Sequence, residues 1–181
     1  METYRIHEDA SVYFVTYSVV SWLPVFVEES ACRIITDSLS FCHSHKSLRL
    51  NAYVIMPTHM HAIVFDHDHD PTRLATELDA FRRYTGRNLA DYCAAHRPRA
   101  YSEAFRDAAG DDRDRRFWQA TRHPIAISSE NFWQTKLDYV HANPVRKGLV
   151  RYPEDWRFSS AKHYACGMDA DADVVISEID W

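Results

Sequence analysis

The sequence predicts an α+β fold, in which helices cover one antiparallel β-sheet. Three segments, 12–20, 48–56 and 59–65, are rich in the β-branched and aromatic residues that favour strands. After segments 12–20 and 59–65 the pattern changes: apolar residues recur three and four positions apart, which is the period of a helix. Only two residues separate the second and third segments, and so short a connection predicts an antiparallel pair. Strands and helices in this order favour a sheet with helices packed on it.

The first strand is expected over Val12–Val20, because this segment is rich in β-branched and aromatic residues and ends in a loop around Pro24. A helix is expected over Glu28–His45. Its apolar stripe consists of Ala31, Ile34, Ile35, Leu39 and Cys42. Such a stripe buries one side of a helix, so we expect this helix to pack on the sheet.

The second and third strands are expected over Leu48–Met56 and His59–Phe65, with Pro57 and Thr58 between them. A polar loop follows, and Thr72 is expected to cap a helix that ends near Ala95. Gly86 should weaken the middle of this helix, because glycine costs conformational entropy there. For residues 96–130, which are dense in Asp and Arg, we expect loops with one brief element.

A last helix should begin near Glu130 and end near Asn143, because Pro144 disfavours helical geometry in the residue before it. The chain is expected to be irregular beyond it. Together the elements predict a ferredoxin-like antiparallel sheet with helices packed on it. We expect one domain over residues 1–166 and an acidic tail over 167–181, for which the composition leaves disorder open.

The net charge of −5 gives a poor first indication of a nucleic-acid partner, but the charge is unevenly distributed. The tail holds five acidic residues and no Lys or Arg, so the other residues carry 21 positive and 21 negative side chains. The arginines of that neutral part occur in clusters. The residues expected to contact phosphates are Arg82, Arg83, Arg87, Arg115, Arg116, Arg146 and Lys147. The alternative is a set of solvated charged faces.

Neither a signal peptide nor a membrane span fits the first apolar stretch, Val12–Val27, because polar residues and Pro24 interrupt it. The four cysteines form no CxxC pair and no short disulfide pattern, as a reducing compartment permits. We therefore expect a cytoplasmic protein with no membrane segment.

His59 and His61 are the candidate metal ligands. They are two positions apart in a predicted strand, so their side chains leave the same face about 6.6 Å apart at ~3.3 Å per residue. Two imidazoles leave room for another ligand, for water and for a phosphate oxygen, as a catalytic site requires. Two ordinary histidines are the alternative. The polar run from Asp66 to Asp70 could also bind metal, but a solvated loop explains it better.

Tyr139 is the candidate nucleophile. It lies on the last predicted helix beside the core-facing residues, on a stripe with Phe132 and Lys136. A tyrosine hydroxyl is a weak nucleophile unless charge is neutralised near it, and a metal on the target phosphate would do so. Asn143 follows four residues later on the same helix face, where its amide oxygen could complete a metal site. A helix C-cap is the alternative role for Asn143.

Taken together, these motifs resemble those of the HUH single-tyrosine transposases, and in particular of the REP-associated tyrosine transposases of bacteria. The resemblance is carried by NAYVIMPTHMHAI at Asn51–Ile63, LDYVHANPVRKG at Leu137–Gly148 and DWRFSS at Asp155–Ser160. They stand in the family's order and span most of the chain. Thr58 stands where many members have Asn, and Asn143 stands where related transposases place a Gln ligand.

The resemblance implies a ferredoxin-like fold and a metal-dependent endonuclease and strand-transferase that acts on single-stranded DNA at hairpin or palindromic repeats. It makes His59 and His61 the ligands of Mg²⁺ or Mn²⁺. It makes Tyr139 the nucleophile that becomes joined to a 5′ phosphate. It also implies a bacterial, nucleoid-associated protein that acts as a monomer or a homodimer.

Three alternatives remain open from the sequence. Tyr84, in the basic segment FRRYTGR, could be the nucleophile in place of Tyr139. The sheet could bind single-stranded nucleic acid on aromatic residues without cutting it. The two histidines could activate water in a metal-dependent hydrolase, with no covalent intermediate.

Overall fold

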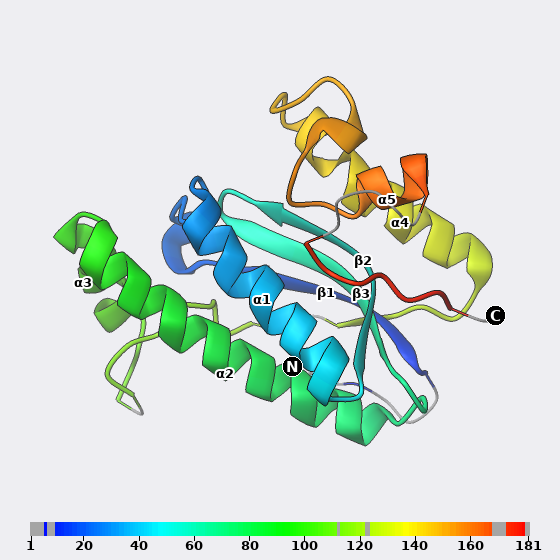
Figure 1. The fold of residues 1–181 in the computed structure, drawn as a ribbon. Coiled ribbons are helices and arrows are strands. Elements are labelled where there is room, and N and C mark those ends of the chain that lie inside the picture. The colour runs from blue at the N-terminus through cyan, green and yellow to red at the C-terminus, as the bar shows by residue number, and fades with distance from the viewer. Residues whose placement is uncertain (1–5, 7–9, 112, 122–123, 168–172, 180–181) are drawn as a thin grey trace.

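A computed structural model describes residues 6, 10–111, 113–121, 124–167 and 173–179. Its centre is a four-stranded antiparallel sheet with the strand order β2-β3-β1-β4 (Figure 1). The strands are β1 (Val12–Ser18), β2 (Leu48–Met56), β3 (His59–Asp66) and β4 (Ile125–Ala126). Strand β3 pairs with β1 on one side and with β2 on the other, so the two histidines lie inside the sheet and not at its edge.

The helices lie on both faces of this sheet (Figure 1). They are α1 (Glu29–His45), α2 (Pro71–His96), α3 (Arg99–Asp107), α4 (Glu130–Arg146) and α5 (Ala161–Cys166), with short 3-10 helices η1 (Val20–Trp22) and η2 (Pro153–Asp155). The order β1-α1-β2-β3-α2-β4, with β1 and β3 in the middle of the sheet, confirms the predicted ferredoxin-like arrangement. None of the described helices has the length and apolarity needed to cross a membrane.

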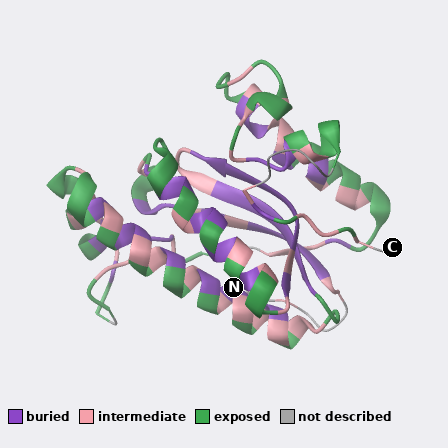
Figure 2. Ribbon diagram, viewed as in Figure 1, coloured by how far each residue is buried: buried purple, intermediate pink, exposed green. Residues whose placement is uncertain are grey.

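Two separate cores result from the alternation of side chains along the strands. On one face Tyr13, Val15 and Tyr17 of β1 pack with α1 and α2. On the other face Val12 and Phe14 pack with α4, through residues such as Leu137 and Val140. Figure 2 shows the buried strands between these two layers of helices, whose outer faces are exposed. The first core is the larger, and the face under α4 is the one that carries the histidines.

The outer edge of β2 is covered by residues that come much later in the chain. The amide of Ile55 donates to the carbonyl of Phe158 at 2.8 Å, and the amide of Ser160 donates to the carbonyl of Tyr53 at 2.9 Å. The indole of Trp156 adds a bond to the Ile55 carbonyl at 2.9 Å. The segment 156–160, expected to be irregular, therefore completes the hydrogen bonding of the sheet edge.

The C-terminal segment 173–179 lies along the same edge. The amide of Ser177 donates to the carbonyl of Leu50 at 2.8 Å, and Val174 is buried in the larger core. Asp173 accepts from Arg157 at 3.2 Å. This part of the acidic tail is therefore docked, in contrast to the disorder that its composition left open. Residues 168–172 and 180–181 lie outside the described residues.

Asn51 joins several elements at a bulge in β2. Its side chain accepts from the Trp133 indole of α4 at 2.7 Å and donates to the carbonyl of Ser177 at 3.0 Å. Its backbone carbonyl accepts from the Tyr164 hydroxyl of α5 at 3.0 Å. A buried polar side chain is tolerated here because its hydrogen bonds are made.

The start of α2 differs from the prediction by two residues. Asp70, and not Thr72, is the N-cap, because its carboxylate accepts from the backbone amides of Thr72 and Arg73 at 2.9 and 3.0 Å. Pro71 then occupies the first helical position, where its missing N–H costs nothing.

The predicted end of α4 is also wrong, because the helix continues through Pro144 to Arg146. Gly148 stops it instead, with a φ of 68° in the left-handed region that glycine tolerates. Its neighbour Leu149 donates to the carbonyl of Pro144 at 2.9 Å. Asn143 is therefore inside the helix and is not its C-cap.

Within the described part of the region 96–130 there are two elements, α3 and β4, where the sequence predicted one brief element. Helix α3 has nine residues and buries Phe105, while β4 has two residues and pairs with Tyr13 and Phe14 of β1. Two residues are too few to show an alternating pattern, so β4 is recognised only by its pairing with β1.

Gly86 lies where α2 approaches Trp118 closely. A Cβ atom at this position would lie 3.1 Å from Cδ1 of the indole, and the same indole donates to Thr85 at 3.1 Å. The glycine thus does not interrupt the helix, but it allows this contact.

Replacement of Gly86 by Leu should displace Trp118 and lower the free energy of unfolding by about 1–3 kcal/mol, the usual cost of overpacking. Urea denaturation would measure it, with Ala94→Leu on the exposed side of α2 as the control. A Gly86→Leu protein as stable as the control would contradict this account of the contact.

Candidate functional site

The two histidines lie side by side on the face of β3 that α4 covers in part. In the ladder with β1, His59 faces Ser18 and His61 faces Thr16. Their ring centroids are 4.8 Å apart and the rings are inclined by 73°. His61 is only 5% exposed and stacks on Phe14, with centroids 5.2 Å apart. The predicted pair is therefore formed, with His59 nearer the surface.

A threonine hydroxyl contacts the Nδ1 atom of each ring. Thr16 Oγ1 lies 2.7 Å from Nδ1 of His61, and Thr58 Oγ1 lies 3.0 Å from Nδ1 of His59. When Nδ1 carries the proton and donates to the hydroxyl, Nε2 keeps its lone pair. Such contacts behind a ligand fix both the tautomer and the direction of the ring. In that tautomer both rings have an oriented Nε2 atom with a free lone pair.

Burial keeps both imidazoles neutral. Desolvation lowers the pKa of His61 to about 3, with smaller electrostatic contributions from the protonated form of His59 and from Lys136. Desolvation also lowers the pKa of His59 to about 4, with a smaller contribution from Lys147. A neutral imidazole is the form that binds a metal ion.

Tyr139 of α4 lies next to His61. Their ring centroids are 5.2 Å apart, and the tyrosine also contacts the edge of Phe14 at 5.9 Å. Its side chain is 37% exposed, so solvent and a substrate can reach it. The guanidinium of Arg146, two helical turns later, lies 5.4 Å from the centre of the tyrosine ring. Positive charge therefore stands beside the predicted nucleophile.

Asn143 is buried in α4, one turn after Tyr139. Its amide nitrogen donates to the backbone carbonyl of Tyr139 at 3.1 Å. The side-chain oxygen is therefore the atom that could bind a cation. Among the residues that the structure describes, no group of three or more His, Cys, Asp or Glu is placed to hold a metal ion. The amide oxygen of Asn143 stays the predicted third ligand beside the two histidines.

Trp22 was missed by the sequence reasoning. It lies at the end of β1 in η1, is 56% exposed, and meets the ring of His59 edge-on with centroids 5.9 Å apart. Ser21 and Trp22 have φ values of 55° and 54°, in the left-handed region. Neither is glycine, so this conformation costs energy that the surrounding structure must supply. No local sequence signal marks such a pair of residues.

The predicted phosphate-binding residues divide into two groups. Arg146 and Lys147 end α4 near Tyr139. The other five come together with one further arginine, Arg113, around a surface groove of about 560 Å³ between α2 and the segment 113–118. We call it the arginine groove; its arginines are Arg82, Arg83, Arg87, Arg113, Arg115 and Arg116. It lies on the side of the larger core, away from α4.

Tyr84, the alternative nucleophile, is 62% exposed on α2. Helix α2 packs on the sheet face opposite to the one that carries His59 and His61. Tyr84 lines a different groove, between α1 and α2. The structure therefore separates it from the candidate metal ligands.

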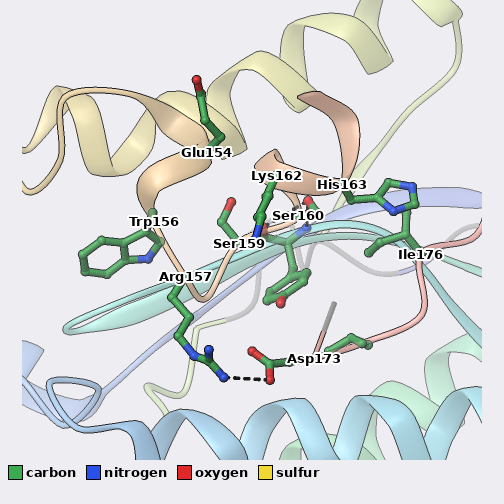
Figure 3. A pocket seen from close by; sticks show the side chains of 11 residues that line it. Glu154, Trp156, Arg157, Ser159, Ser160, Lys162, His163, Asp173 and Ile176 are labelled. Carbon is green, nitrogen blue, oxygen red and sulfur yellow. Dashed lines mark hydrogen bonds and ion pairs between the residues drawn. The ribbon is translucent and has the colours of Figure 1, made fainter. Parts of the chain in front are cut away.

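Two other polar clusters have structural roles. The carboxylate of Asp66 accepts from the amides of Asp68 and Asp70 and pairs with Arg73, so the polar run after β3 folds around this side chain. The small cavity of about 30 Å³ in Figure 3 lies between Ser160, His163 and the docked tail. The Ser160 hydroxyl there is bonded to the backbone of Tyr53, so it holds the sheet edge.

The fold and the paired histidines define a class of protein, an α+β sheet with a histidine pair and a tyrosine on one face. No family model matches the sequence, and neither does any curated protein. Among solved structures the chain is similar to a REP-associated tyrosine transposase, which was solved bound to a REP hairpin. The TM-score is 0.64 at 19% sequence identity, over 100% of this chain and 95% of that one. The likeness establishes a shared fold along the whole chain.

The buried histidines predict a loss of stability in mild acid. The pKa of His59, His61 and His141 is lowered in the folded chain, so below the unfolded value of 6.5 the unfolded chain binds more protons. The free energy of unfolding should fall between pH 6.5 and about 4, by at most about 1.4 kcal/mol per pH unit for each histidine. Urea unfolding across this range would measure it. A free energy independent of pH there would contradict the burial of these neutral rings.

Proposed function

We propose that this protein is a metal-dependent endonuclease and strand-transferase of single-stranded DNA, which acts at hairpin-forming repeats through a covalent 5′-phosphotyrosine. The observation that carries the proposal is the meeting of His59, His61 and Tyr139 on one face of the sheet, with ring centroids 4.8 and 5.2 Å apart. The three residues come from two elements far apart in sequence. The shared fold with a tyrosine transposase supports the same function.

In the proposed reaction, the phenol oxygen of Tyr139 attacks the phosphorus of a phosphodiester. The bond from phosphorus to the 3′ oxygen breaks, the phenol proton passes to solvent, and the 3′ oxygen takes up a proton. The 5′ phosphate stays esterified to Tyr139. Attack by another 3′ hydroxyl on this ester reverses the step and joins two DNA ends.

The neutral, oriented rings of His59 and His61 support a divalent cation at this site. We propose that His59 and His61 bind it through Nε2, and that the amide oxygen of Asn143 is the third ligand. A bound Mg²⁺ or Mn²⁺ would draw charge from the target phosphate and make the phosphorus more electrophilic. Arg146 and Lys147 add positive charge at the end of α4 and are proposed to hold the DNA backbone there.

The covalent intermediate is directly testable. Labelled single-stranded hairpin oligonucleotides from repeats flanking the gene, incubated with Mn²⁺, should yield a protein-DNA adduct on a denaturing gel. Tyr139→Phe removes the attacking oxygen and keeps the ring against His61, so the adduct should vanish. Tyr84→Phe is the matched control and should form as much adduct as the wild type. A chelator should abolish the adduct in both active proteins.

The same gel separates the alternatives. An adduct that is lost only in Tyr84→Phe would move the nucleophile to α2 and overturn the proposal. Cleavage without any adduct would favour a hydrolase that activates water. Binding without cleavage would favour a nucleic-acid-binding module.

The threonine behind His61 gives a test on metal binding without DNA. Thr16→Val keeps the shape of the side chain but removes the hydroxyl at Nδ1. Loss of such an outer contact typically costs about 10- to 100-fold in metal affinity. Titration with Mn²⁺, followed by the electron paramagnetic resonance signal of the free ion, would measure it. Thr135→Val, on the exposed side of α4, should leave the affinity unchanged, and equal affinities in both variants would disprove a positioning role for Thr16.

A further inference from the structure

The arginine groove and the histidine pair are linked across one end of the sheet. Ser18 at the end of β1 faces His59 in the ladder. The amide of Gln119 donates to the carbonyl of Ser18 at 2.8 Å, and the carbonyl of Gln119 accepts from the guanidinium of Arg82. Neighbouring strands lie about 4.8 Å apart, so β3 and Gln119 are separated by about 10 Å. A few nucleotides of extended DNA span that distance.

Trp22 stands at the same end of the sheet. The amide of Val19 donates to the carbonyl of Thr58, and the amide of Val20 donates to the carbonyl of Phe117, both at 2.9 Å. Thr58 precedes His59 in sequence, and Phe117 lines the arginine groove. The loop that presents the exposed indole is therefore fastened to the histidine strand and to the groove. Ser21 and Trp22 have left-handed φ values, a costly conformation for residues other than glycine, and Trp22 is 56% exposed.

The groove itself suits a chain of phosphates. Six arginines line it, with Asp114 as the acidic residue among the lining residues. Arg115 pairs with Asp91 at 2.6 Å. Arg83 and Arg87 are exposed on α2. Arg83 and Arg87 are four residues apart on α2 and therefore present their guanidinium groups on the same side of the helix. Guanidinium groups bind phosphate oxygens in a bidentate manner.

We propose that Trp22 and the arginine groove form the binding track for the unpaired DNA beside the cleaved bond. One base stacks on Trp22, and the phosphates that follow lie in the groove around the edge of the sheet. An aromatic ring can stack on the open face of an unpaired base, whereas a base inside a paired stem is covered on both faces by its neighbours. The inference rests on the proposed function, because it places the scissile phosphate at His59 and His61.

Binding measured without catalysis tests the track. Every protein carries Tyr139→Phe and the buffer contains EDTA, so neither the nucleophile nor a metal contributes. Fluorescence anisotropy would compare two labelled hairpins, one with a long unpaired flank on each side and one blunt-ended. The variants are Arg83→Gln with Arg87→Gln, and Trp22→Ala. The controls are Arg99→Gln with Arg106→Gln, which removes the same charge from α3, and Trp22→Phe, which keeps an aromatic face.

For the flanked hairpin, loss of Arg83 and Arg87 should weaken binding and reduce the dependence of log Kd on log salt by about 1.4, at ~0.7 for each phosphate contact. Trp22→Ala should weaken binding by about 5-fold to 100-fold without changing that salt dependence, and Trp22→Phe should recover most of it. The blunt hairpin should show neither effect. The α3 control should bind both hairpins as the parent protein does.

Three results would overturn the track. Equal weakening of both hairpins by the groove variant would mean that the groove binds the paired stem. Equal weakening by the α3 control would mean that only total charge matters. Unchanged binding in both test variants would leave no role for the track in DNA binding. A failure of the proposed cleavage can be told apart from a failure of the track. In that case the wild-type protein forms no adduct on the gel, while the expected differences in hairpin binding between the variants are still observed.

Discussion

The register between β1 and β3 is the constraint on which the rest of the molecule depends. Side chains alternate along a strand, so His59 and His61 share one face with Ile63, while Met60 and Ala62 point to the other. A slip of one residue would turn both histidines towards the larger core and bring Met60 under α4. Burial of apolar residues on both faces makes such a slip costly. The same packing that stabilises the sheet therefore keeps the histidine pair beside Tyr139.

The unequal covering of the two faces explains how the site is both ordered and accessible. Two long helices close one face over the larger core, whereas α4 covers the other face only in part (Figure 1). The inner ring, His61, is held by Phe14, Thr16 and Tyr139 in a dry environment. The outer ring, His59, lies near an exposed tryptophan at the open end. Burial keeps the rings neutral and their contacts fix their directions, while the exposed end near Trp22 leaves the site open to solvent.

The sequence predicted the strands β1 to β3, the helices α1, α2 and α4, and the meeting of His59 with His61, because each depends on a local period. The sequence-based predictions failed where contacts between residues far apart in the chain determine the local structure. Pro144 is inside α4 because Gly148 offers a better end to the helix, and Gly86 is tolerated because Trp118 needs the space. The placement of Trp22 and the gathering of arginines from α2 and the segment 113–118 depend on tertiary packing. No pattern along the chain could reveal them.

The closure of the β2 edge by segments 156–160 and 173–179 bears on how copies of the chain can associate. An open edge strand is a template on which a second molecule can add a strand, which leads to sheet-mediated dimers or to aggregation. In this protein the backbone groups of Leu50, Tyr53 and Ile55 at the β2 edge are already hydrogen-bonded to segments 156–160 and 173–179 of the same chain. At the opposite edge the described residues include the two-residue strand β4, which pairs with Tyr13 and Phe14 of β1. Strand addition at β2 would have to displace segments 156–160 and 173–179, so the structure disfavours self-association through the β2 edge.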